Sequence, residues 1–409
     1  CYTYFVCGNF GIGSKNAKYS IIFKMDVPAY EDLLKQIKIN FWIAGIPLGD
    51  PKVYIRYYIL IFLIILMIIE EVSFFVSRIS SENFLELTQL TPCACIGILS
   101  VMKMLSVTAK RRKIFNLTER LGRLYNTILE DTQKTTVIKR ELQLLKFLTK
   151  YFFVLNLILI SVYNFSTLIY IVYQYVTKNK VVFILPYAVL LPFSIDSWLP
   201  WCVVYIHSIV CGFICVLYFT TVDILYCVLT SHVCNNFSVI SDKLKNLEAN
   251  NVNILGDIVK EHQYILKLAD DLEDIFTAPN LFNVLVGSIE ICALGFNLTT
   301  GSLAQLPGSI LFLTSVLLQI LMMSIFGENL ITESRKIGEA AFLCKWYEMD
   351  KKSKKIILLI MTRSRKPQTL TAYKFSVISY GSFSKIISTS WSYFTILKTV
   401  YKPPEINHE

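Results

Sequence analysis

Residues 197–222 read SWLPWCVVYIHSIVCGFICVLYFTTV, residues 151–177 read YFFVLNLILISVYNFSTLIYIVYQYVT, and neither stretch contains a charged residue. The hydrocarbon core of a bilayer takes about 20 mostly apolar residues per helix, and only a helix or a closed barrel satisfies its own backbone there. Each stretch is long enough, so each predicts a helix that crosses a membrane.

The remainder of the 409 residues agrees with a lipid environment, because 54% of the chain is apolar and only 17% is charged. The net charge of +10 is dispersed in short segments between apolar runs, which does not favour a nucleic-acid surface. The chain has four His and lacks HExxH, GxSxG and Gly-Lys phosphate-loop motifs, so we expect no enzyme, metal site or cofactor. We interpret the Cys residues in the apolar runs as packing residues rather than a disulfide framework.

Five further apolar segments complete a prediction of seven crossings. The uncharged stretch Ile291–Gly327 is divided by a turn at Pro307 and Gly308. The last segment carries three lysines, so we expect protein or water to shield most of it. The five segments are 53–79, 84–107, 278–303, 308–327 and 372–401.

Lys and Arg in the connecting loops predict the orientation, since cytoplasmic loops are rich in both. Residues 1–56 hold seven, 108–150 eleven, 224–277 four and 328–374 eleven, whereas 77–83 hold one and 178–196 two. We therefore expect an all-α membrane protein with seven transmembrane helices, a cytoplasmic N-terminus and an extracellular C-terminus. Apolar residues at helical spacing over 228–276 predict that the helices continue past the membrane, so that helices 4 to 6 extend into a cytoplasmic anchor region.

These boundaries divide the chain into segments with different expected roles. Residues 1–24 lack an initiator Met and a sustained apolar run, so we expect translation to begin at Met25 and residues 1–24 to be an artefact of annotation. The predicted segments are 1–52 (cytoplasmic N-terminal segment), 53–223 (helices 1 to 4), 224–277 (cytoplasmic helical extension), 278–327 (helices 5 and 6), 328–371 (cytoplasmic segment), 372–401 (pore-lining helix 7) and 402–409 (extracellular tail).

The final segment carries small and hydroxyl-bearing residues at steps of three and four, which places them on one helical face. Such a face is typical of a seam between membrane helices, and it is also typical of a helix that borders water in a channel. The sequence leaves both interpretations open. The residues are Gly381, Ser384, Ser388, Ser392, Thr395 and Thr399.

The stretch PQTLTAYKFSVISYGSFSKIISTSWSYFTILKTVY, residues 367–401, resembles the carboxyl-terminal signature of insect odorant receptors. EHQYILKLADDLEDIF, residues 261–276, is similar to a His-Gln-x-x-Leu helix of that family. The signature positions here are Pro367, Leu370, Ala372, Phe375, Phe383, Ser392, Tyr393 and Phe394.

The resemblance implies an odorant-gated, non-selective cation channel that forms a tetramer with a coreceptor in the plasma membrane of a sensory dendrite. Its implied partners are a small volatile apolar ligand, the coreceptor and membrane lipid, with no nucleic acid. The 54 residues 224–277 have no room for the coreceptor's long insertion, so we expect a ligand-tuning subunit. The alternatives are a gustatory-type ligand-gated channel, whose Thr-Tyr…Gln-Phe ending is absent here, and a G-protein-coupled receptor, whose orientation is opposite.

The same resemblance places the pore constriction on Ile396 and Val400, with Thr399 as a polar neighbour. Residues at i and i+4 share a helical face, so a ring of such side chains closes a narrow pore by dewetting. Lys398 stands where the family has an aliphatic residue.

An apolar odorant calls for a buried cavity with few polar groups. The family places this cavity among the outer halves of helices two, three, four and six. The candidate ligand-binding residues are Leu87, Thr91, Tyr163, Thr167, Tyr170, Trp201, Tyr205, Ile209, Leu313 and Val316. For Glu290, an isolated acid within the membrane, we expect a structural partner.

Overall fold

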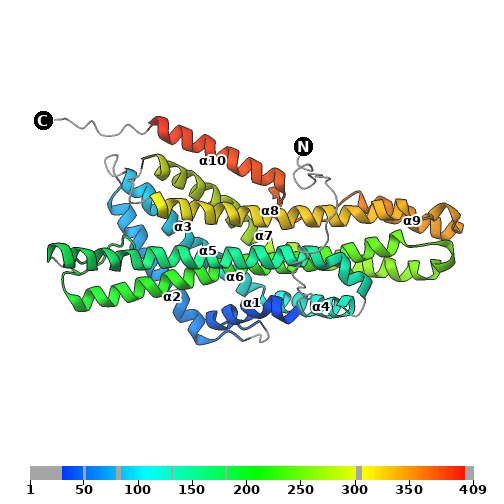
Figure 1. Cartoon of the computed structure of the whole chain (residues 1–409), viewed down its shortest axis with the longest axis horizontal. Coiled ribbons are helices and arrows are strands. Elements are labelled where there is room, and N and C mark those ends of the chain that lie inside the picture. Colours follow the sequence, from blue (N-terminus) through cyan, green and yellow to red (C-terminus); the bar gives the residue numbers. More distant parts are fainter. Residues whose placement is uncertain are drawn as a thin grey trace, which may run out of the picture.

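The computed structural model describes residues 30–48, 52–79, 84–129, 132–179, 182–300 and 306–400. The predictions for residues 1–24 and 402–409 lie outside these ranges. Almost every element is a helix, and one two-stranded antiparallel hairpin precedes the last helix (Figure 1). The elements are α1 (Tyr30–Ala44), α2 (Ile55–Ser77), α3 (Phe84–Ala109), α4 (Arg111–Leu129), α5 (Thr132–Lys178), α6 (Trp198–Lys245), η1 (Ala249–Ile254), α7 (Leu255–Thr300), α8 (Leu306–Leu343), η2 (Trp346–Glu348), α9 (Lys351–Ser364), β1 (Thr371–Ala372), β2 (Ser376–Val377) and α10 (Tyr380–Val400).

Six helices in the described ranges, α2, α3 and α5 to α8, are long and apolar enough to cross a membrane. They coincide with the first six predicted crossings, and the all-α prediction is confirmed. The seventh segment forms α10, a helix of 21 residues that carries Lys385 and Lys398 and is not among the six.

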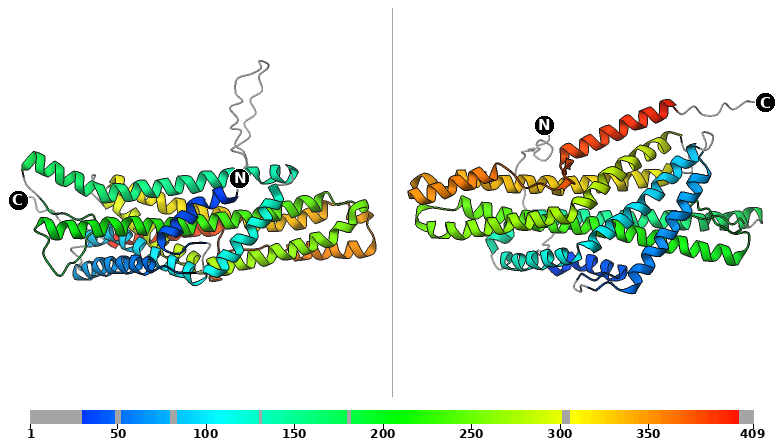
Figure 2. Two further views of the ribbon diagram at one scale, coloured as in Figure 1. Left: turned by 90° about the horizontal axis from the view of Figure 1, so that it is seen from below. Right: turned by 180° about the vertical axis from the view of Figure 1, so that it is seen from behind.

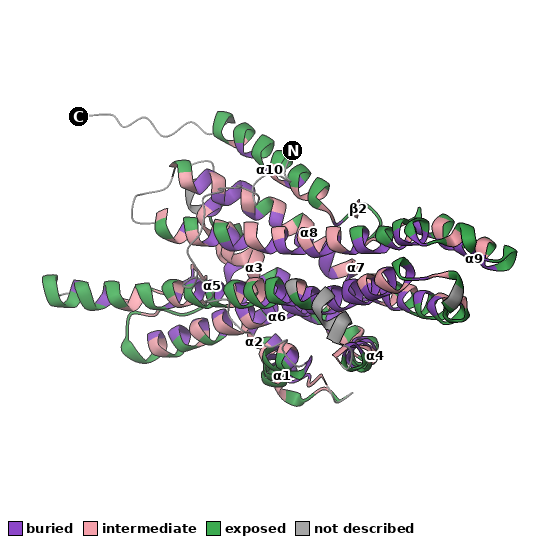
Figure 3. Cartoon of the chain, turned by 45° about the vertical axis from the view of Figure 1, so that its right-hand side comes forward, coloured by how far each residue is buried: buried purple, intermediate pink, exposed green. Residues whose placement is uncertain are grey.

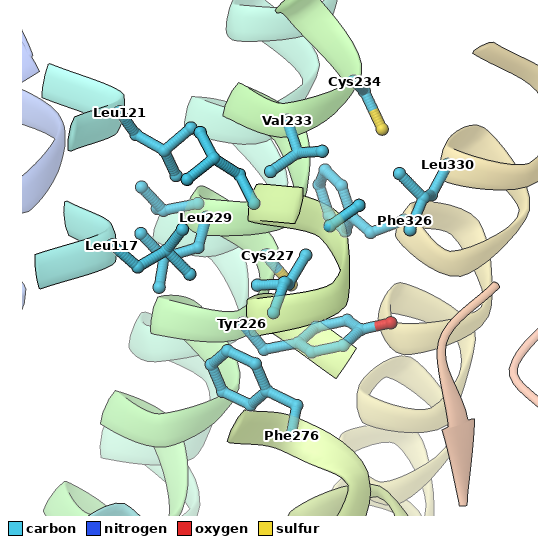
Figure 4. Packing of buried hydrophobic residues seen from close by; sticks show 14 of the residues in the cluster. Leu117, Leu121, Tyr226, Cys227, Leu229, Val233, Cys234, Phe276, Phe326 and Leu330 are labelled. Carbon is cyan, nitrogen blue, oxygen red and sulfur yellow. The ribbon is translucent and has the colours of Figure 1, made fainter. Parts of the chain in front are cut away.

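Helix α6 is the centre of the bundle and packs against α3, α5, α7 and α8. A helix that is apolar on all sides belongs in a core, and α6 from Tyr218 to Phe237 is buried throughout. Figure 4 shows Tyr226 and Val233 of α6 among Leu121 of α4, Phe276 of α7 and Phe326 of α8.

The helices α6, α7 and α8 extend well beyond the length of one crossing, as predicted for helices 4 to 6. Together with α9 they form one end of the bundle, called here the α9 end. Asp350 caps α9 by accepting hydrogen bonds from the backbone N–H groups of Lys352 and Ser353. Lys345, which follows α8, donates to the Glu248 carboxylate at 2.8 Å, and this contact lowers the pKa of Glu248.

The hairpin β1–β2 corrects the predicted start of the last helix, because α10 begins at Tyr380 rather than at residue 372. Tyr373 and Lys374 in the turn adopt positive φ angles of 48° and 63°, which a helix does not allow. The hairpin is fixed to α7, since the Glu273 carboxylate accepts hydrogen bonds from the backbone N–H and hydroxyl of Thr371 at 2.8 and 2.5 Å.

The residues that follow the hairpin contact α8, and α10 leaves this point along the outside of the bundle (right-hand view of Figure 2). The Ile378 backbone lies so close to Gly327 of α8 that a Cβ at that position would overlap the Ile378 carbonyl oxygen. The backbone N–H of Tyr380 donates to Glu328 at 3.2 Å. A glycine is therefore required where the last helix departs from the bundle.

Gly327→Ala is expected to destabilise the protein by about 1 to 3 kcal/mol, the usual cost of overpacking. The matched control is Gly256→Ala in α7, where a Cβ meets nothing within 4 Å and alanine is the better helix former. Thermal unfolding of the detergent-purified variants measures the difference. Equal melting temperatures for the two variants would contradict the close packing of Gly327 against the Ile378 backbone.

Candidate functional site

A cavity of about 390 Å³ lies between the membrane helices at the end of the bundle opposite α9. Its walls come from α2, α3, α5, α7 and α8 and from the segment between α5 and α6. A smaller apolar pocket adjoins it and shares Glu71, Cys93, Tyr163 and Tyr187. The lining of the larger cavity also includes Phe75, Pro92, Ala94, Ser166, Leu294, Asn297, Gly308 and Ser309.

Tyr187 belongs to the segment between α5 and α6 and lines the cavity from that side. Its hydroxyl donates to the side-chain oxygen of Asn164 at 2.9 Å, and Tyr205 donates to the backbone oxygen of Asn164 at 2.6 Å. A Cβ on Gly212 would come within 2.5 Å of the Tyr187 hydroxyl oxygen, so a glycine in α6 makes room for this ring. The segment between α5 and α6 is thereby folded into the helical bundle.

Glu71 is the one charged side chain that lines either pocket in the described part of the chain. It belongs to α2 and is 8% exposed. Because an ionised group in an apolar site is costly unless it is paired, its presence here is unusual.

A cluster of buried polar side chains lies about three turns of α3 beyond the cavity, towards the α9 end. Lys103 of α3 is fully buried and its ammonium lies 2.7 Å from the Asp223 carboxylate of α6. Gln319 of α8 and Asn283 of α7 donate to the same carboxylate at 2.9 and 3.2 Å. The lysine that interrupts the second predicted crossing is therefore neutralised inside the bundle rather than exposed to lipid.

The expected partner of Glu290 is not found. Its side chain is fully buried in α7, and neither carboxylate oxygen has a hydrogen-bond partner among the residues that the structure describes. Asn297, one of the lining residues, is 4% exposed and its amide donates to the backbone oxygen of Thr88 at 2.9 Å.

Helix α10 packs on the bundle through one face only, with Ile386, Ser390 and Phe394 buried. The Ser390 hydroxyl donates to the backbone oxygen of Ser288 in α7 at 3.1 Å. The hydroxyl-bearing face predicted from the sequence is exposed along its whole length, as Figure 3 shows for most of α10. Within this chain, that face is not the seam between α10 and α7.

Two of the three predicted gate residues share this outward location. Ile396 is 57% exposed, and Thr399 is exposed with its hydroxyl donating to the backbone oxygen of Thr395 at 2.9 Å. The backbone of Val400 belongs to α10, whereas its side chain lies outside the described part of the structure.

Of the ten predicted ligand-binding residues, Tyr163 lines the cavity, and its ring meets Phe312 edge to face. The other nine do not line it. On α3, the Thr91 hydroxyl donates to the backbone oxygen of Leu87, and on α5, Thr167 is half-buried while Tyr170 is 47% exposed. A cluster beside α5 contains Trp201, Tyr205 and Ile209. An apolar cluster on α8 contains Leu313 and Val316.

The cluster at Trp201 explains part of this difference. The rings of Trp201 and Tyr205 stack at 4.8 Å, and the indole N–H donates to the backbone oxygen of Ile184 at 2.9 Å. Helical spacing predicted correctly that these residues share a face. It does not say that this face meets the segment between α5 and α6 instead of the cavity.

The lining residues that the sequence did not single out include Tyr187 and Cys93. Tyr187 lies in a connection without periodicity, so the sequence carries no signal for it. Glu71 did have a signal, because a carboxylate at the end of an apolar run is a candidate site residue in a membrane helix.

These features define a class of protein, a multi-pass helical membrane protein with a cavity among its helices. The family model described as 7tm Odorant receptor matches residues 83–391. The chain belongs to this odorant receptor family, a family of receptors rather than enzymes, and it is a multi-pass membrane protein.

Individual proteins agree with this assignment. Odorant receptor 67a of Drosophila melanogaster is 27% identical over 347 residues, which cover 81% of this chain and 85% of that protein. The odorant receptor coreceptor of Aedes aegypti is 26% identical over 141 residues, which cover 34% of this chain and 30% of that protein. The structure of the olfactory receptor OR5 from Machilis hrabei in complex with eugenol aligns with a TM-score of 0.76 and 18% identity, over 91% of this chain and 100% of that one.

Proposed function

We propose that this chain is the ligand-tuning subunit of an odorant-gated cation channel, which works as a tetramer with a coreceptor and has the orientation predicted from the loop charges. The 390 Å³ cavity carries the proposal, because it has the size of a small-molecule site, is lined by aromatic and aliphatic side chains with several polar groups, and has an apolar pocket beside it. The coreceptor of Aedes aegypti matches a much smaller share of this chain than odorant receptor 67a does, which favours a tuning subunit.

Helix α7 connects the cavity with α10 in this proposal. Leu294 and Asn297 line the cavity, and on another side of the same turns Cys292 and Phe296 pack against Phe394 of α10. A ligand shifts a conformational equilibrium only by binding one state better than the other. An odorant that stabilises one position of this part of α7 therefore also selects a position of α10.

The outward face of α10 supports its role as the pore helix. Its hydroxyl groups are suited to a water-filled path, and Ile396 interrupts them with an apolar group that closes such a path when several subunits meet. Lys398 is exposed as well, and its long side chain allows the ammonium group to point away from the path.

The test is an electrical recording from cells that express the chain with and without a coreceptor while G-protein signalling is blocked. We expect odour-evoked cation current only when both subunits are present. Ala94→Phe, which fills the cavity, is expected to raise the half-maximal odorant concentration about tenfold or more, equivalent to at least about 1.4 kcal/mol of binding.

Ala109→Phe, an exposed position at the end of the same helix, is the matched control and is expected to leave the response unchanged. Current that disappears only when the G protein is blocked would contradict the channel. An unchanged response of Ala94→Phe would remove the cavity as its ligand site.

A separate prediction concerns the gate. Ile396→Asn is expected to raise the current in the absence of odorant, because a polar ring no longer excludes water from the closed pore. Ile387→Asn is the control, since nine residues at about 100° each place it on the opposite side of α10. If basal current and ion selectivity of Ile396→Asn match those of the unmodified receptor, Ile396 is not part of the gate.

A further inference from the structure

The Glu71 carboxylate faces the candidate ligand cavity without a partner. It is nine-tenths buried and lines both the larger cavity and the apolar pocket beside it. Among the residues that the structure describes, no side chain or backbone group donates a hydrogen bond to it. A buried carboxylate of this kind is costly, so a group that pairs with it gains more than the same group gains in water.

The surroundings leave this pairing to a ligand. No Lys, Arg or His lines either pocket, and the buried cation Lys103 is held by Asp223 at 2.7 Å. The hydroxyl of Tyr187 already donates to Asn164, so its hydrogen is not available to Glu71. The acids nearby, Glu70 of α2 and Glu290 of α7, line neither pocket.

The remaining wall suits a cation as well as an apolar skeleton. The aromatic rings of Phe75, Tyr163 and Tyr187 line the cavity together with Glu71. Aromatic faces attract ammonium groups, most strongly where water is excluded. A carboxylate beside several aromatic rings is therefore a site for a small amine with an apolar body.

We propose that the odorants of this receptor are small amines whose nitrogen shares a proton with the Glu71 carboxyl group. Either the carboxylate accepts a hydrogen bond from the ammonium ion or the carboxylic acid donates one to the free amine, and the total charge of the pair is the same in both cases. This inference rests on the proposed function, because it names the ligand class of the proposed odorant site.

The experiment compares amines with neutral molecules of the same skeleton on cells that express the receptor and a coreceptor. The probes are benzylamine, benzyl alcohol and toluene, and hexylamine, hexanol and hexane, applied in strongly buffered solution so that the amines do not change the external pH. We expect each amine to act at a concentration about tenfold or more below that of its alcohol, the ratio that corresponds to about 1.4 kcal/mol.

Glu71→Gln keeps the size and polarity of the side chain but removes the anion. We expect this variant to respond to the alcohols and to lose the preference for amines. Glu70→Gln is the matched control, because Glu70 is the neighbouring acid on α2 and lines neither pocket. Elution of each purified variant as a monodisperse species shows that it has folded.

The outcomes separate this inference from the proposed function. Currents evoked by the neutral probes but not by the amines would overturn the amine proposal and leave the channel intact. The same conclusion holds if Glu71→Gln retains the full preference for amines. Absence of current with every probe, from a folded receptor at the cell surface, would count against the proposed channel itself.

Discussion

The ion pair between Lys103 and Asp223 is the interaction on which the rest of the bundle depends. It joins α3 to α6 where both charges are shielded from solvent, and the Lys103 ammonium also lies 4.1 Å from the centre of the Phe219 ring. Removing one partner of a buried pair leaves an uncompensated charge and costs about 3 to 5 kcal/mol. Since Gln319 and Asn283 donate to the same carboxylate, one set of contacts fixes the relative positions of α3, α6, α7 and α8.

The functional features are arranged around this cluster. Towards the α9 end, the long helices pack closely around the apolar residues of α6. At the opposite end of the bundle, the helices and the segment between α5 and α6 line the cavity that contains Glu71. Helix α10 is added outside, where its start contacts α8 at Gly327 and its buried face packs on α7 and α8, two of the helices that line the cavity. Its remaining face is free for contacts beyond this chain.

The sequence predicted the apolar helices well, because burial in lipid imposes length and composition on each segment separately. It did not predict interactions between distant segments. Lys103 lies within the second predicted crossing, and the sequence carries no signal for its partner Asp223, which lies 120 residues away. The hairpin before α10 was missed because its turn depends on two residues with positive φ, Tyr373 and Lys374, neither of which is glycine.

The candidate site shows the same limit. Helical spacing grouped Trp201 with Tyr205 correctly, but the direction of a helical face depends on its neighbours, and here the neighbour is a connecting segment. Tyr163 was identified because it lies on a helix that faces the cavity. Glu71 was not among the predicted ligand-binding residues, although its burial gives the cavity its chemical character.

The most direct test of this account is a double-mutant cycle on the buried pair, measured as thermal unfolding of detergent-purified Lys103→Met, Asp223→Asn and the double variant. Each single variant is expected to lose much of the stability, and the double variant is expected to be clearly more stable than the sum of the two losses implies. The exposed pair of Lys38 and Glu31 serves as the reference, for which a coupling below about 1 kcal/mol is expected. Strictly additive losses at Lys103 and Asp223 would contradict the central role of the ion pair.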